Sequence, residues 1–204
     1  TANFEQTLTL PSSSMISGNI TTGSTVRSPV TVNQACGGCE EPDRVDIGQI
    51  VSAHSGSAND NDEINLSPSA LSTPSGNRRL DLPCGKYFLD EIVSEKRVTI
   101  VAHGRTALFV DGDIDVDIQL HILPTSGAEL DVFVAGNVQL SNNIQIGSPA
   151  YPASTRMYVG GANGMNLMNQ GTIGAYFYAV PGTIQTSNNF ELFGGMVAKS
   201  FDTG

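Results

Sequence analysis

Four aspartates at alternate positions form the most chemically suggestive pattern of this sequence. They are Asp111, Asp113, Asp115 and Asp117, and in one extended strand their carboxylates would share a face. Carboxylate oxygens are good ligands for Ca²⁺, but calcium takes about six to eight oxygens, so neighbouring segments must supply the others. Paired carboxylates also serve glycoside hydrolases. The simpler interpretation is an acidic face that keeps an exposed strand soluble.

A second oxygen-rich cluster follows the pattern Asp-Asn-Asp-Glu over residues 60–63. It lacks the glycine and the distal glutamate of an EF-hand loop. We expect either a turn or cap ahead of Ile64, or calcium ligands from Asp60 and Asp62. Calcium is the only cofactor that these two acidic clusters suggest.

No set of residues predicts a catalytic centre. His54, His103 and His121 are scattered, and no nucleophile-elbow, phosphate-loop or dinucleotide motif is present. The sequence therefore assigns no catalytic residue and favours a non-enzymatic protein. A carbohydrate-active β-helix enzyme is an alternative that rests on fold analogy and on the aspartate pattern.

The three cysteines predict one disulfide with one thiol left over. Cys36 and Cys39 have CxxC spacing, but the glycines between them and the acidic residues and proline that follow suggest a loop. A redox pair normally opens a helix, and a structural zinc site needs more ligands. We predict that Cys84 pairs with Cys36 or Cys39, with a Cys36–Cys39 bond as the alternative. Such a bond indicates an oxidising compartment.

Composition limits the class of protein and its partners. The chain has 204 residues, 39% of them hydrophobic, and a formal net charge of -10. This length suits a single domain. The acidic balance argues against nucleic acid and against anionic lipid, and no apolar run is long enough to cross a membrane. Together with the predicted disulfide, this acidic composition with few charged residues suggests an oxidising compartment.

An internal repeat gives the strongest evidence on fold. The tetrad aromatic-Val-x-Gly begins at Phe109, Phe133 and Tyr158, with spacings of 24 and 25 residues, and a looser copy ends Val180-Pro181-Gly182. Short alternating strands follow, and Ser-Asn-Asn recurs at residues 141–143 and 187–189. Alternation predicts that Ile114, Val116 and Ile118 point inward. The asparagines are typical of hydrogen-bonded turns.

A period of this length predicts an all-β, right-handed parallel β-helix-like solenoid with coils of about 20–25 residues. The alternative is a β-sandwich, which does not require the repeated tetrad. We expect a single domain over residues 1–204. Residues 1–32 form the first strands or coil, residues 33–79 an insertion with the CGGC loop and a short helix, and residues 80–204 the coils.

Five segments taken together resemble a known family. They span residues 82–89, 104–113, 128–136, 156–161 and 194–199. The set resembles an uncharacterised β-helix-like domain family of exported proteins from myxobacteria and related proteobacteria, some of them behind pilin-like or lipoprotein leaders. The resemblance implies a right-handed β-helix-like domain at the cell surface. It supplies no activity and no catalytic residue.

The sequence therefore favours an extracellular structural or adhesive module, and a filament or appendage subunit within that class. The open ends of a solenoid pair with other chains unless they are covered. The alternating N-terminal segment could add to a neighbour's edge through Phe4, Thr7, Leu8 and Leu10. The expected partners are other copies of the chain, joined end to end or by strand addition, or a surface glycan or protein. A glycan- or Ca²⁺-binding module is a further alternative.

Overall fold

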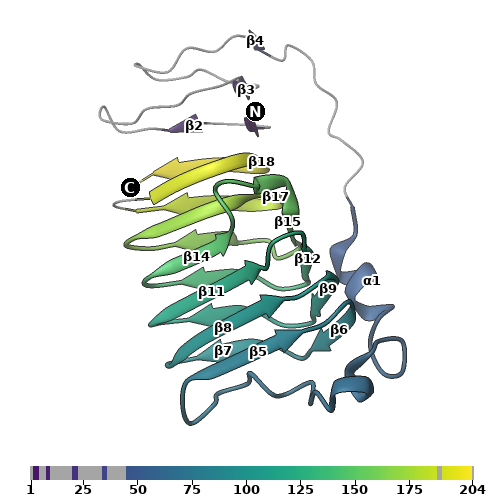
Figure 1. The fold of residues 1–204 in the computed structure, drawn as a ribbon. Coiled ribbons are helices and arrows are strands. Elements are labelled where there is room, and N and C mark those ends of the chain that lie inside the picture. The colour runs from purple at the N-terminus through teal and green to yellow at the C-terminus, as the bar shows by residue number, and fades with distance from the viewer. Residues whose placement is uncertain are drawn as a thin grey trace.

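The computed structural model describes residues 45–187 and 190–203, together with four short N-terminal strands. The chain folds into a β-solenoid whose strands pair in parallel (Figure 1), so the predicted solenoid is confirmed and the β-sandwich is excluded. Helix is confined to α1 (Ile47–Ser52) and the 3-10 turns η1 (Asn61–Ile64) and η2 (Pro152–Ser154) within the described residues. None of these helices is long and apolar enough to span a membrane.

The strands wind around three faces, which we number in chain order. Face 1 holds β5 (Arg78–Leu82), β8 (Arg97–Ala102), β11 (Gln119–Pro124) and β14 (Ile144–Gly147). Face 2 holds β6 (Gly85–Leu89), β9 (Arg105–Val110), β12 (Glu129–Val134) and β15 (Thr155–Val159). Face 3 holds β7 (Ile92–Ser94), β10 (Ile114–Val116), β13 (Val138–Leu140) and β16 (Gly164–Leu167). The longer strands β17 (Gly171–Thr186) and β18 (Phe190–Thr203) each pass over all three faces.

Four N-terminal strands complete the sheet: β1 (Ala2–Phe4), β2 (Leu8–Thr9), β3 (Ile20–Thr22) and β4 (Gln34–Ala35). They lie beyond β18, at the opposite end of the stack from β5 (Figure 1). We call the end at β5 the lower end and the end at β18 the upper end.

The core fills the space inside the coils. Alternate side chains point inward and stack in columns, one residue per coil, as in the run Ile92, Ile114, Val138, Met165 and Ile184. Each of these five is at most 1% exposed. A single coil cannot bury its inner face, so the stacking of coils supplies the hydrophobic stabilisation.

The repeated tetrad marks one position of successive coils. Phe109 pairs with Phe133, and Phe133 pairs with Tyr158. The glycines that end the three tetrads stack at the corner between faces 2 and 3, where Gly136 N donates to Gly112 O and Gly161 N donates to Gly136 O. A Cβ on Gly136 would lie 2.7 Å from Gly112 O, which explains the requirement for glycine. The repeat was therefore a correct guide to the coil register.

Asparagines close the corner between faces 3 and 1. Asn142 Nδ2 donates to Asp117 O at 2.8 Å, and Asn169 Nδ2 donates to Asn142 Oδ1 at 2.8 Å. Asn143 and Asn169 adopt the left-handed conformation that such a turn needs. The structural role predicted for the first Ser-Asn-Asn triplet is confirmed, whereas the asparagines of the second lie outside the described residues.

Two local expectations on face 3 are wrong. The strand after Gly112 contains only residues 114–116, because the chain turns at a corner on each side. Ile118 lies beyond the second corner and is 45% exposed, so it does not continue the inward pattern of Ile114 and Val116. Likewise Asp115 alone of the four aspartates lies within the strand, so a single-strand ladder of four carboxylates does not form.

Candidate functional site: the two ends of the solenoid

At the lower end, side chains cap the edge of β6 in place of a neighbouring strand. Asn61 is 4% exposed, its Oδ1 accepts from Phe88 N at 2.9 Å, and its Nδ2 donates to Phe88 O at 2.8 Å. Asp60 Oδ2 accepts from Lys86 N at 2.7 Å, while Asp60 N donates to Lys86 O at 2.7 Å. Alternate backbone groups of β6 are therefore satisfied without a neighbouring coil.

The same capping segment continues along the edge of the first coil. Asp90 N donates to Pro68 O at 2.9 Å, and Val93 N donates to Leu71 O at 3.1 Å. Leu66 and Leu71 are buried in the core cluster and cover it from below. Residues 60–73 thus cap the lower edges of β6 and β7, which blocks strand pairing on faces 2 and 3 of the first coil.

The upper end is covered in a different way, by strands from the start of the chain. β1 pairs with β18 in parallel, with Asn3 opposite Val197 and Phe4 opposite Ala198. β2 pairs with the next part of β18, with Leu8 opposite Phe201. Of the predicted self-assembly residues, Phe4 and Leu8 therefore lie in strands on this edge, whereas Thr7 and Leu10 lie outside the described residues.

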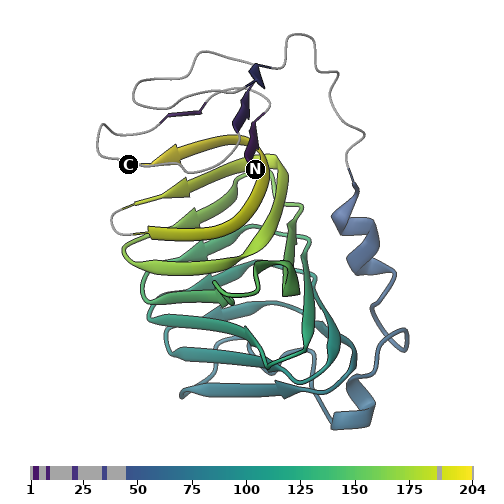
Figure 2. The same ribbon diagram turned by 45° about the horizontal axis from the view of Figure 1, so that its top comes forward.

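The N-terminal strands extend the stack beyond the last coil. β3 pairs with β1, and β4 pairs with β3, again in parallel. Because β1 is parallel to β18, the first strands occupy the place that the next coil would take. Residues far apart in sequence are therefore neighbours at the upper end, and α1 lies alongside face 2 between the two ends (Figure 2).

Helix α1 packs on an external ladder of aromatic rings. His54 stacks on Phe109 with ring centroids 3.9 Å apart, and the stack continues through Phe133 and Tyr158 to Tyr178. The helix begins after Asp46, whose Oδ1 accepts from Gln49 N at 2.9 Å, and Ile47 and Val51 are buried against the rings. This helix lies within residues 33–79, the segment in which the sequence predicts a short helix, and its N-cap is Asp46.

The aspartates proposed as calcium ligands have structural partners or lie apart. Asp113 Oδ1 accepts from Asn137 N at 2.7 Å, and Asp117 Oδ1 accepts from Ser141 Oγ at 3.3 Å, each in the next coil. Asp111 lies with Asp113 at the corner between β9 and β10, Asp60 holds β6, and Asp62 is exposed on η1. Burial and the charges of Asp117 and Asp113 raise the pKa of Asp115.

No group of three or more His, Cys, Asp or Glu residues could hold a metal ion within the described part of the chain. The calcium hypothesis therefore gains no support from these positions.

Cys84 is an exposed free thiol in this structure. The predicted bond from Cys84 is consequently not formed. Cys36 and Cys39 lie outside the described residues, so the Cys36–Cys39 alternative stays a prediction.

A charged triad lies on face 1 near the lower end. Arg79 donates to both carboxylate oxygens of Asp81 at 2.8 Å, and His103 Nε2 lies 2.7 Å from Asp81 Oδ1. The hydrogen bonds from Arg79 and then from His103 lower the pKa of Asp81 to about 2. Asp81 therefore stays ionised at any physiological pH. Sequence analysis missed this triad, because its members share no motif.

The triad predicts a small pH-dependent contribution to stability. The pKa of Asp81 is lowered in the folded state, so its contribution is present above its usual pKa of 3.8 and is lost as the pH falls through about 2. We expect Asp81→Asn to lower the melting temperature at pH 7 by at most about 2 °C, since the pair is exposed. Melting curves of the two proteins should converge near pH 2. If the parent and Asp81→Asn differed in melting temperature by the same amount at pH 7 and at pH 2, the ionised Asp81 would not be the source of this stability.

Comparison with known proteins gives one family and no individual relative. Residues 39–204 match DUF7305, a domain of unknown function. Neither the curated proteins nor the solved structures give a significant match. The matched region contains α1, the lower cap and the coils up to β18, whereas β1, β2, β3 and β4 precede it. With most of its length inside the match, the chain belongs to the DUF7305 family, a domain family of unknown function whose fold here is a β-solenoid.

Proposed function

We propose that this protein is a non-enzymatic structural or adhesive module of the bacterial cell surface, and that its copies join by strand addition at the upper end of the solenoid. One observation carries the proposal: the edge of β18 pairs with strands that lie outside the matched domain. Export to the surface is supported by the acidic, lightly charged composition and by the resemblance to exported proteins.

The difference between the two ends of the solenoid supports joining at the upper end. The lower edges of β6 and β7 are capped by Asp60, Asn61 and the segment that follows them, so no strand is needed there on faces 2 and 3. The upper edge is covered by β1 and β2 through main-chain pairing, which any chain of the same sequence can offer. An N-terminal segment that pairs within its own chain can therefore exchange with that of a neighbour, as in domain swapping.

The exchange is tested with single cysteines at paired positions. Cys36, Cys39 and Cys84 are first replaced by serine, and Asn3→Cys is introduced in one tagged copy and Val197→Cys in another. These positions are opposite each other in the register of β1 and β18. Neighbouring strands lie about 4.8 Å apart, within disulfide range. Oxidation of the mixture should give a disulfide-linked heterodimer, in a yield that rises with protein concentration.

A matched control uses Glu191→Cys in place of Val197→Cys. Glu191 lies on the same strand but on face 1, opposite Thr172 of the preceding coil and away from the pairing with β1. Oxidation of the Asn3→Cys copy mixed with the Glu191→Cys copy should give far less heterodimer. Negative-stain electron microscopy of the unmodified chain should show end-to-end chains at high concentration. Discrete short rods at every concentration, with no heterodimer above the control, would show that the strands pair only within one chain.

A further inference from the structure

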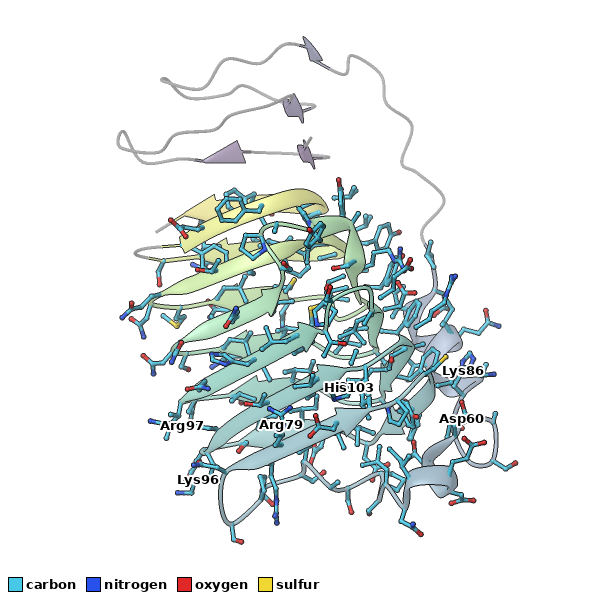
Figure 3. All side chains as sticks on the ribbon, in the orientation of Figure 1. Asp60, Arg79, Lys86, Lys96, Arg97 and His103 are labelled. Carbon is cyan, nitrogen blue, oxygen red and sulfur yellow. The ribbon has the colours of Figure 1, made fainter. Side chains whose placement is uncertain are left out.

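Positive charge is concentrated on one side of an acidic protein. The chain has 10 Lys and Arg residues against 20 Asp and Glu. Four of the cations lie at the lower end of face 1: Arg78 and Arg79 in β5, Arg97 at the start of β8, and Lys96 just before it. Figure 3 shows Arg79, Lys96 and Arg97 on the same side of the molecule, while Lys86 and Asp60 lie toward α1.

Few acids neutralise these cations. Within the described strands of face 1 the acidic residues are Asp81 in β5 and Glu191 in β18, at opposite ends of the stack, and Glu95 lies on the turn before Lys96. Within the described residues Lys96 and Arg97 form no ion pair. Arg156 on face 2 is different, since it bonds Asp131 and lies 2.9 Å from Glu129 Oε2.

Arg79 keeps binding capacity although it is paired. Its bonds to Asp81 use two of the five N–H donors of a guanidinium. Because Asp81 stays ionised, it holds Arg79 in a fixed direction over the face, where the side chain is 59% exposed.

Above the cations, face 1 carries polar hydrogen-bonding side chains at a regular spacing from coil to coil. One outward column follows Arg79 through successive coils, with members Thr99, His121, Gln145 and Thr172. Successive members are spaced by the separation of neighbouring strands, about 4.8 Å. A neighbouring column places Gln119 opposite Arg97.

We propose that face 1 binds an anionic polysaccharide, with Arg79, Lys96 and Arg97 holding its carboxylate or sulfate groups. Thr99, His121 and Gln145 then hydrogen-bond hydroxyl groups further along the polymer. Charge complementarity selects an anion, and the hydroxyl, imidazole and amide column suits sugar hydroxyls. A single-stranded nucleic acid fits less well, because it stacks its bases on aromatic rings. The strands of face 1 from β5 to β14, and β17 up to Gly174, carry no Phe, Tyr or Trp.

Binding is measured by isothermal titration calorimetry with four probes: polygalacturonate, dextran sulfate, neutral dextran and oligo(dT). We expect binding to one or both acidic polysaccharides, no binding to dextran, and weaker binding as salt rises. Dextran and dextran sulfate share a backbone, so their comparison isolates the anion. Polygalacturonate against dextran sulfate distinguishes carboxylate from sulfate.

The site is located with two matched double variants. Lys96→Gln with Arg97→Gln removes two charges from face 1, and Lys86→Gln with Arg105→Gln removes two from face 2 of the same coils. The first pair should weaken binding at least about tenfold and the second by less than about twofold. All these side chains are on the surface, so both variants should melt like the parent.

Three results would overturn the proposal: equal weakening by the two pairs, tighter binding of oligo(dT) than of either polysaccharide, or no binding of any acidic polysaccharide. The strand-exchange experiment does not involve these residues, so the two proposals fail independently.

Discussion

Asn61→Ala is expected to lower the free energy of unfolding by about 3 kcal/mol. The substitution removes both hydrogen bonds to Phe88 and leaves a buried N–H and a buried C=O without partners. Each such group costs about 1–3 kcal/mol. Because a solenoid is stabilised coil by coil, hydrogen exchange should rise first in β5, β6 and β7 and much less in β17.

Asn77→Ala is the control for the loss of a capping asparagine. Asn77 Oδ1 accepts from Arg97 N at 3.2 Å, but this bond is exposed and water can replace it. Its loss should cost less than about 1 kcal/mol. Asn61→Asp tests the donor separately, since a carboxylate still accepts from Phe88 N but repels Phe88 O. If urea unfolding showed equal stability for Asn61→Ala and Asn77→Ala, the capping role of Asn61 would be refuted.

Gly136→Ala is expected to cost about 3 kcal/mol or more. The added methyl group would lie 2.7 Å from Gly112 O and 2.2 Å from Asp113 Oδ1. Backbone cannot move aside cheaply, and Asp113 Oδ1 also accepts from Asn137 N. Overpacking of this kind costs about 1–3 kcal/mol before the lost hydrogen bond is counted. Thermal and urea unfolding measure the change.

Gly76→Ala provides the comparison at an unconstrained glycine. A Cβ there has no neighbouring atom within 4 Å, and Gly76 has no positive φ. We expect a change within about 0.5 kcal/mol, in either direction. Equal costs at Gly136 and Gly76 would mean that the glycine stack is not required for the corner.

Sequence reasoning found the coil period because the aromatic tetrad repeats where the coils stack. It missed one rung of the same ladder and the aromatic residue of another. Phe88 pairs with Phe109, but its copy of the motif lacks the glycine. In the looser copy, the ring that pairs with Tyr158 is Tyr178. β17 carries extra residues before Thr183, and these move the proline and glycine away from their usual distance to the ring.

The ends were harder to predict than the middle. The cap formed by Asp60 and Asn61 depends on Lys86 and Phe88, more than twenty residues away, and no local pattern encodes that contact. The sequence predicted that the N-terminal segment adds to the edge of a neighbouring chain, and it did not predict the pairing of Phe4 with Ala198 within one chain. The aspartate pattern was a poor guide because the corners on each side of β10 divide the four carboxylates between one short strand and two corners of the same coil.

The placement of β1 on β18 has a consequence for the order of events during synthesis. A ribosome makes residues 2–9 well before it makes their partner in β18. The first strands therefore emerge, and in an exported protein cross the membrane, long before their own edge exists. During that interval the edge of an already folded copy is the one available to them. If copies join by the proposed strand addition, the timing of translation sets a competition between closing a chain on itself and joining it to a predecessor.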